Sequence, residues 1–175
     1  ILDDCAPTPF NLGEMSKVWL HHSLDNLNQA LNKKLNLYTG KTKQIIASLI
    51  EQQAVNHIYC NACYEPWYSA QENEIHALCK EKGIHYQVFN SNYLWNPRQI
   101  LKNDGTYYKV FTAYKNKAYH HNPRHAIKET HTINAIKDCN NHTELADFKL
   151  IPSDKTWHKK IIHLFRQIYS LRESK

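Results

Sequence analysis

Two cysteines have the spacing of a metal or redox site. Cys60 and Cys63 form a Cys-x-x-Cys pair, which is typical of zinc sites and of thioredoxin-like redox motifs. A structural zinc ion needs four ligands, and the sequence has no second pair of this kind. The spacing therefore favours two inert thiols near the end of a strand.

Histidines gather in one polar stretch, at His120, His121, His125 and His131. Such tracts can bind metal ions. A specific site requires partners at fixed spacing, and neither carboxylates nor thiolates stand at one here. We expect no metal site in this stretch.

Glu65, next to Tyr64, could act as a general acid. Acid catalysis requires a second carboxylate or a nucleophile beside it, and none is placed there. The alternative is that Glu65 caps or braces the loop that enters a helix. We favour that structural role and expect no complete catalytic site in this chain.

Four closely spaced aromatic residues, Tyr107, Tyr108, Phe111 and Tyr114, could stack on nucleic-acid bases. Such residues also cover a sheet edge or the contact with a neighbouring domain. Exposed aromatic patches usually mark interfaces, so we favour a domain contact.

The composition limits the class of protein. The chain has 175 residues, the size of one domain, and 42% of them are hydrophobic, enough for a packed core. Only four glycines occur, which argues against a Gly-rich phosphate-binding loop. The net charge of +6 is compatible with nucleic acid as a partner, directly or through an attached domain.

Targeting signals are not visible in the sequence. No apolar run approaches the length of about 20 residues that a membrane helix needs, and no signal peptide is recognisable. Five scattered cysteines then indicate reduced thiols. We expect a cytoplasmic protein that does not engage a membrane.

Helices and strands alternate along the first half of the chain. Apolar residues recur at helical spacing or alternate at strand spacing. The pattern predicts helices over 16–33, 41–53 and 68–82, the last ending at Gly83, and strands at 1–2, 35–39, 55–61 and 84–90. The segment that follows, to about Tyr119, is predicted as loop with short turns.

This alternation is typical of an α/β fold with a parallel sheet and helical crossovers. Such sheets bind ligands beyond the carboxyl ends of their strands, which here lie near Asp3, Gly40, Asn61 and Asn90. We expect three parts in the chain. They are an α/β domain over 1–119, a His/Asn/Lys-rich linker over 120–152 and an amphipathic C-terminal helix over 153–175.

Three segments in this order and spacing resemble the N-terminal domain of the DNA photolyase and cryptochrome family. They are Trp19–Leu24 with its Leu-His-His-Ser-Leu run, Asn61–Trp67 with its Asn-x-x-Tyr-Glu-Pro run, and Gly105–Lys115 with its Gly-x-x-Tyr-x-Val-Phe-Thr pattern. The resemblance covers residues 1 to about 120. It implies a doubly wound, Rossmann-like domain that holds a light-harvesting antenna pigment, which is a folate, a deazaflavin or a flavin. It also implies a helical FAD domain that binds DNA and splits pyrimidine dimers.

The chain departs from the family pattern in three ways. The family's first strand, the middle of its sheet, is not recognised before Ile1, so the strand pair at Ile1 and Leu35 lacks a central neighbour. The helical FAD domain is not present, so FAD enters only through a domain outside this sequence. The asparagine–glutamate pair of folate-binding members is replaced by Trp67 and Tyr68, and an expected arginine by Ala70.

The resemblance implies an antenna portion of a deoxyribodipyrimidine photolyase or cryptochrome-related protein, without catalytic activity of its own. This chain would interact with DNA only indirectly. The alternative is a non-catalytic remnant or interaction module that docks an FAD domain, in cis or in trans, through its aromatic stretch. If a pigment binds, the residues expected to hold it are Cys5, Lys17, Asn61, Glu65, Trp67 and Tyr68.

Overall fold

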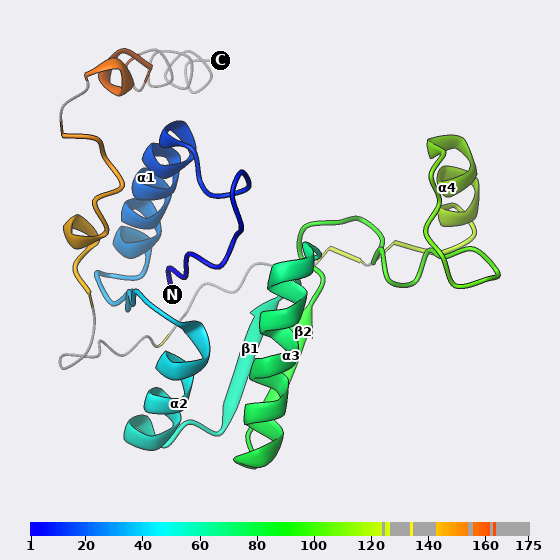
Figure 1. The fold of residues 1–175 in the computed structure, drawn as a ribbon, viewed down its shortest axis with the longest axis horizontal. Helices are drawn as coiled ribbons and strands as arrows, with labels where there is room; N and C mark the ends of the chain where they lie inside the picture. Colours follow the sequence, from blue (N-terminus) through cyan, green and yellow to red (C-terminus); the bar gives the residue numbers. More distant parts are fainter. Residues whose placement is uncertain (124, 127–133, 135–142, 154–155, 162, 164–175) are drawn as a thin grey trace. The chain divides into compact units, whose positions relative to one another are not determined.

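The structure is a computed structural model that describes residues 1–123, 125–126, 134, 143–153, 156–161 and 163. The chain divides into two compact units, Ile1–Ile45 with Thr132–Lys175, and Ile46–His131 (Figure 1). The following paragraphs treat each unit by itself. The domain boundaries expected at 119 and 152 stay predictions.

Helix α1 of the first unit spans Glu14–Ala30. Val18 is its buried anchor at 3% exposed. Asn32 and Lys33 adopt φ angles of 54° and 61°, which lie outside the right-handed helical region. The helix therefore ends a little before the predicted residue 33.

Leu2 and Thr39 form an isolated parallel bridge. The Leu2 N–H donates to the Tyr38 carbonyl at 2.7 Å, and the Gly40 N–H donates to the Leu2 carbonyl at 3.0 Å. Directly after the bridge, the Asp3 carboxylate accepts the backbone N–H of Thr42 at 2.7 Å. Thr42 is the first residue of helix α2, so this carboxylate lies at a helix N-terminus, where negative charge is stabilising.

The strand predicted over 35–39 was wrong in extent, because only Thr39 pairs. The reason is that the other backbone groups have different partners. The Leu35 N–H donates to Oδ1 of Asn28 at 3.1 Å, and the Leu37 carbonyl accepts the N–H of Thr143 at 2.6 Å. With these groups engaged, no ladder can form along the segment.

The later part of the first unit contains a 3₁₀ helix, η1, over Leu145–Phe148, inside the expected linker. Its start carries a capping box in which Glu144 and Asp147 satisfy each other's backbone N–H groups. Leu150 follows at 4% exposed and belongs to the core. Of the expected C-terminal helix, residues 157–161 and 163 are described as helical, and the rest lies outside the described residues.

The second unit is built on two parallel strands, β1 (His57–Asn61) and β2 (His85–Phe89). Both strands lie where the alternating pattern predicted them. Their register pairs His57 with His85 at one end and Asn61 with Phe89 at the other. Within the described residues they form a two-stranded sheet, and the Leu2–Thr39 bridge lies outside it.

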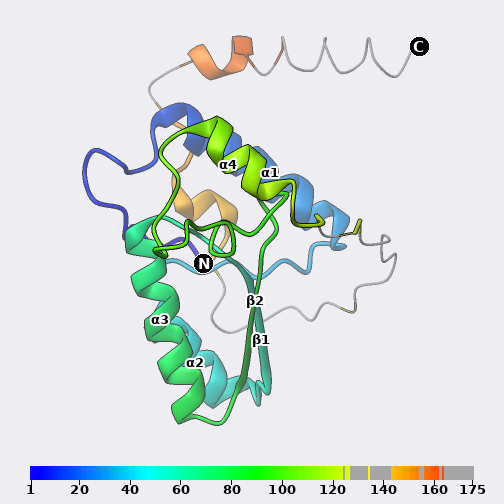
Figure 2. The ribbon, with the colours of Figure 1, turned by 90° about the vertical axis from the view of Figure 1, so that its right-hand side faces the viewer.

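Helix α3 (Pro66–Glu81) connects the strands and lies along one face of the pair (Figure 2). Pro66 at its first position has no N–H to leave unsatisfied. Gly83, with φ 69°, follows its C-terminal end, as the sequence predicted. Ile75, Leu78 and Cys79 form its buried side.

Helix α4 (Phe111–Ala118) corrects the prediction of loop up to Tyr119. Phe111, Tyr114 and Ala118 stand at i, i+3 and i+7, which is helical spacing. Ala118 is fully buried, whereas Phe111 is 73% exposed. The sequence had predicted these aromatic residues in a loop and had favoured a contact with a neighbouring domain for them.

Helix α2 (Thr42–Gln53) follows the prediction for 41–53 closely. Ala54, with a φ of 48°, follows its last residue. Glu51 near its end pairs with Lys82 at 3.2 Å, on the surface. Of the helices that the structure describes, none is long and apolar enough to cross a membrane.

Candidate functional site

The carboxyl ends of β1 and β2 meet at one edge of the sheet, where the two following loops come together. Pairing continues one residue past the strands, because the Ala62 N–H donates to the Phe89 carbonyl at 2.8 Å. The loop at Cys63–Glu65 leads into α3, and the loop after Asn90 leads away from β2. This is the edge at which open α/β sheets bind ligands.

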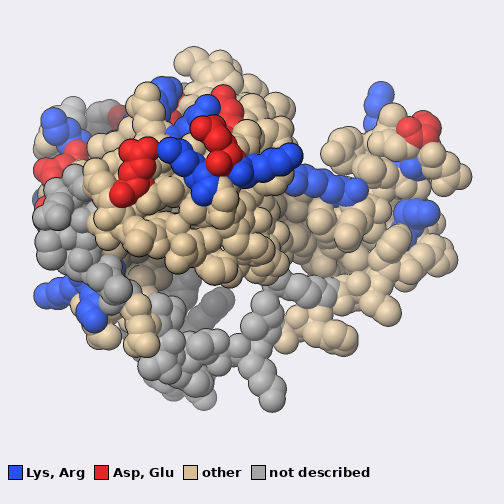
Figure 3. Space-filling model, turned by 90° about the horizontal axis from the view of Figure 1, so that it is seen from below, with Lys and Arg blue, Asp and Glu red and all other residues tan. Residues whose placement is uncertain are grey.

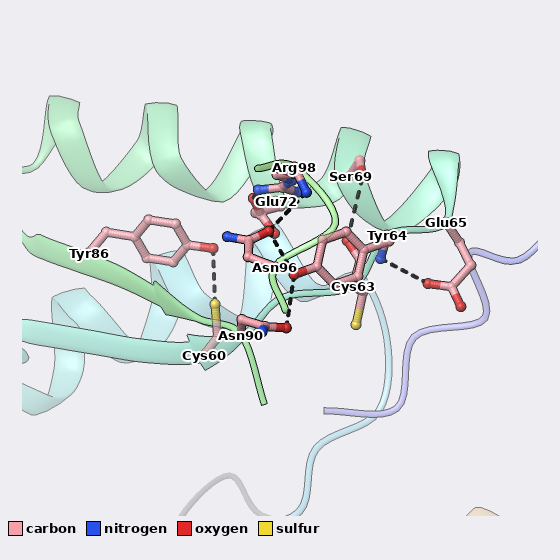
Figure 4. A network of polar contacts seen from close by, with 10 residues as sticks. All are labelled: Cys60, Cys63, Tyr64, Glu65, Ser69, Glu72, Tyr86, Asn90, Asn96 and Arg98. Atoms are coloured by element: carbon pink, nitrogen blue, oxygen red, sulfur yellow. Dashed lines mark hydrogen bonds and ion pairs between the residues drawn. The ribbon is translucent and has the colours of Figure 1, made fainter. Parts of the chain in front are cut away.

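Tyr64 connects the two loops (Figure 4). Its hydroxyl lies 3.1 Å from Oδ1 of Asn90 and 3.3 Å from Oδ1 of Asn96, and donates to these oxygens. The Asn90 amide in turn donates to the Tyr93 carbonyl at 2.8 Å. Burial raises the pKa of the Tyr64 hydroxyl, so the hydroxyl keeps the proton that the hydrogen bonds require.

Arg98 brings a positive charge to the same place. Its guanidinium lies 5.3 Å from the centre of the Tyr64 ring, within the range of a cation–π contact. It also donates to Glu72 of α3 at 3.0 Å. This hydrogen bond raises the pKa of Arg98, so the guanidinium keeps its positive charge.

Glu65 precedes the first residue of α3 and takes the N-cap position. Its carboxylate accepts the backbone N–H of Tyr64 at 3.1 Å and makes no side-chain cap hydrogen bond to the helix. The Ser69 hydroxyl donates to the Cys63 carbonyl at 3.5 Å. Glu65 therefore braces the loop, in agreement with the favoured prediction.

Cys60 lies inside the contact between the strands and α3. Its sulfur is 3.2 Å from the Tyr86 hydroxyl. Burial, followed by this hydrogen bond, raises the pKa of Tyr86 well above its ordinary value. Neither Cys60 nor Cys63 forms a disulfide bond within the described residues, and these residues contain no group of three or more His, Cys, Asp or Glu that could hold a metal ion.

We expect the change Tyr64→Phe to lower the free energy of unfolding by about 1–2 kcal/mol. It removes one hydroxyl and leaves two half-buried amide oxygens with fewer donors. Urea denaturation followed by circular dichroism measures the loss. Tyr93→Phe is the matched control, because Tyr93 packs edge-on against Tyr64 at 5.1 Å and is 51% exposed. Equal losses in both variants would contradict the role of the Tyr64 hydroxyl.

Four of the six predicted pigment residues lie in the second unit. Asn61 ends β1 and is exposed, and Glu65 braces the next loop. Trp67 and Tyr68 begin α3, both half-buried, with ring centroids 6.0 Å apart and planes tilted by 58°. These four thus share the strand edge described above.

Cys5 and Lys17 lie in the first unit. Cys5 is half-buried in the loop after Leu2, and burial raises the pKa of its thiol. Lys17 is exposed in the first turn of α1. That these two residues join the other four in one pocket stays a prediction.

Two pockets are lined by other residues. One, of about 270 Å³, lies beside the Leu2–Thr39 bridge and includes Asp3 and Lys41. The second, of about 280 Å³, lies in the loop after β2 and is lined by residues 91–94, His125 and Ala126. None of the six predicted residues lines either one.

The sequence reasoning missed Arg98, Glu72, Tyr93 and the role of Asn96. Asn96 and Arg98 lie in the segment that was predicted only as loop with short turns. A helical carboxylate and an arginine 26 positions later carry no local signal for pairing. The available signal was the position of the loop, directly after a strand whose carboxyl end was expected to bind ligands.

A model of the DNA photolyase family matches residues 1–133, which is most of the chain. The chain belongs to the DNA photolyase family. The deoxyribodipyrimidine photo-lyase of Agrobacterium fabrum is 26% identical to this photolyase-family chain over 152 residues, which cover 85% of the chain and 32% of that protein. Cryptochrome-2 of Arabidopsis thaliana is 28% identical over 112 residues, which cover 62% of this chain and 18% of that protein.

Solved photolyase structures share the fold. A class III photolyase from Agrobacterium tumefaciens superposes with a TM-score of 0.78 at 24% identity, over 90% of this chain and 33% of that one. An archaeal photolyase from Sulfolobus tokodaii superposes with a TM-score of 0.64 at 19% identity, over 93% of this chain and 38% of that one. The predicted Rossmann-like α/β fold is confirmed. This photolyase-family chain spans between 18% and 38% of the length of the relatives described here.

Proposed function

We propose that this chain is the antenna portion of a photolyase or cryptochrome-related protein and that it binds a light-harvesting pigment. The family match over residues 1–133 carries the proposal. The edge built by Tyr64, Trp67 and Arg98 supports it, because this is where α/β sheets of this kind bind ligands. Excitation energy absorbed by the pigment would pass to FAD on a helical domain.

The chemistry of the edge suits a flat, polar ring. Trp67 and Tyr68 offer aromatic faces for stacking. Arg98 lies beside the Tyr64 ring, and the guanidinium N–H groups beyond the one that pairs with Glu72 would donate to a phosphate or carboxylate tail. Folate, deazaflavin and flavin all combine a flat ring with such a tail. The Sulfolobus tokodaii photolyase was solved with two FAD molecules, with the implication of a novel light-harvesting cofactor, which makes a flavin a candidate for this chain.

The absorption spectrum of the purified protein tests the proposal. We expect a near-UV or blue band that is lost on denaturation, or the appearance of such a bound band when a reduced folate, a deazaflavin or FMN is added. A spectrum of Trp and Tyr alone, with none of the three pigments bound, would overturn the proposal.

Two matched tryptophan variants locate the pigment. Trp67→Leu should weaken binding about tenfold if the ring stacks there. Trp95→Leu removes an indole from the loop after β2, where its Nε1 donates to the His121 carbonyl at 2.8 Å, and should leave binding unchanged. Binding that weakens only in Trp95→Leu would move the pigment away from α3.

The second candidate is a docking module for a helical FAD domain. The observation that favours it is the exposure of apolar side chains around α4. Tyr107, Val110, Phe111 and Tyr119 are between 63% and 73% exposed, and such patches mark interfaces. An FAD domain could be joined in cis, by a longer reading frame, or bind in trans.

Charge on this part of the chain is mixed. On the face drawn in Figure 3, Lys and Arg side chains are interspersed with Asp and Glu. Near the end of α4, Lys115 and Lys117 add positive charge. A docking partner with apolar and acidic groups fits the surface around α4.

Sedimentation velocity of the chain mixed with the helical FAD domain of a relative tests docking. Phe111→Ser should weaken the complex about tenfold or more, since exposed aromatic anchors carry most of an interface's energy. Leu94→Ser, at a position 61% exposed in another loop, is the control. The absence of a complex with the unaltered chain would count against docking in trans.

A further inference from the structure

In the part of the second unit that the structure describes, the face of the β1–β2 sheet opposite α3 carries exposed side chains. Parallel strands are normally covered on both faces. Along β1 and β2 alternate residues are exposed, beginning with His57 and His85. Tyr59 is 58% exposed and Phe89 is 39% exposed. This face therefore presents imidazole and aromatic rings to solvent.

His57 and His85 are direct partners in the register. Paired residues of neighbouring strands project to the same face of the sheet. Their ring centroids are 5.3 Å apart, with the planes at 57°. The backbone holds this placement, because the His85 N–H donates to the Asn56 carbonyl at 3.0 Å.

That separation suits two imidazoles that share one metal ion. A metal–nitrogen bond of about 2.0 Å puts the ion about 3.2 Å from each ring centroid. A tetrahedral angle, as at Zn²⁺, then puts the centroids about 5.2 Å apart, and a right angle, as at Ni²⁺, puts them about 4.5 Å apart. The measured separation is 5.3 Å. Small rotations of the exposed rings can therefore direct a nitrogen of each toward a common ion.

Tyr59 restricts the two rings. It is stacked on His57, with centroids 6.2 Å apart and planes 11° apart. It also meets His85 edge-on at 6.1 Å. Rings that are already confined lose less conformational entropy on binding, which favours a chelate over two independent histidines.

We propose that His57 and His85 form a two-imidazole site for a divalent transition-metal ion, such as Ni²⁺ or Zn²⁺, on the open face of the sheet. Imidazole suits these ions, and water would complete the coordination. The bound ion would connect β1 to β2 directly. Because a two-stranded sheet is marginally stable by itself, and a ligand of the folded state stabilises that state, the ion would also raise the unfolding temperature.

A calorimetric titration of the whole chain with Ni²⁺ tests the site. Ni²⁺ is the probe because thiolates compete less for it than for Zn²⁺. His57→Gln and His85→Gln should each remove one equivalent of bound Ni²⁺, or weaken its binding about tenfold or more. In each variant the rise in unfolding temperature caused by Ni²⁺ should also be lost.

His21→Gln is the matched control. His21 and His22 have the same ring separation, 5.3 Å. They are consecutive residues of α1, and consecutive side chains on a helix do not face a common ligand. Ni²⁺ binding should be unchanged in this variant.

The site would be refuted if both sheet variants bound as many equivalents of Ni²⁺ as the unaltered chain, with the same affinity. An equal loss in His21→Gln would also refute it. Glutamine is polar and both positions are exposed, so circular dichroism should show an unchanged fold. If one of the two sheet variants does not fold, the other by itself still tests whether the ion binds at this site.

Discussion

Replacing Ile100 with alanine is expected to lower the free energy of unfolding by about 2–5 kcal/mol. Ile100 is 2% exposed and is among the largest fully buried side chains that the structure describes. The change removes buried methyl and methylene groups and leaves a cavity. Total stabilities are only about 5–15 kcal/mol, so the expected loss is a large share of the total.

Urea denaturation followed by circular dichroism measures this effect. Leu94→Ala is the matched control, because it removes an aliphatic side chain from the same loop at a position that is 61% exposed. The Leu94→Ala change should alter the free energy of unfolding by no more than about 0.5 kcal/mol. Equal losses in the two variants would show that Ile100 is not a core residue.

Cys79 is expected to react with iodoacetamide roughly a thousandfold more slowly than Cys63 in the folded chain. A fully buried thiol reacts only through opened molecules, which make up about one in a thousand or fewer. Cys79 is 0% exposed, and burial raises the pKa of its thiol. Because the thiolate is the reactive form, the raised pKa also disfavours any direct reaction of Cys79 in the folded chain.

Mass spectrometry of the alkylated peptides over time measures both rates in one sample. Cys63 is half-buried in the loop before α3 and serves as the internal reference. In concentrated urea the two rates should become similar. If Cys79 is modified at the rate of Cys63 without denaturant, the packing of α3 on the sheet is incorrect.

The sequence was informative wherever structure depends on neighbouring residues. Pro66 and Gly83 bracket α3, and alternation locates β1 and β2. The segment 35–39 has the composition of a strand, yet the side chain of Asn28 and the backbone of Thr143 engage its polar groups. No pattern within five residues could show that.

The residues of the candidate site likewise fall into those found from the sequence and those found only in the structure. Asn61, Glu65, Trp67 and Tyr68 were found because they stand in a recognisable run directly after a strand. Their grouping with Cys5 and Lys17 comes from the family resemblance and stays a prediction. Asn90 was expected at this edge, but its hydrogen bond with Tyr64, 26 residues earlier, and that of Asn96, 32 residues from Tyr64, were not found.

The sequence alone was enough to identify the photolyase-type α/β fold and the ends of most helices and strands. Periodicity, prolines, glycines and short motifs act over a few residues, so they can be read without coordinates. Only the tertiary structure placed Arg98 over the Tyr64 ring and brought His57 opposite His85. These contacts join residues that are distant in the chain, and they depend on how α3 packs against the two strands, which local sequence does not specify.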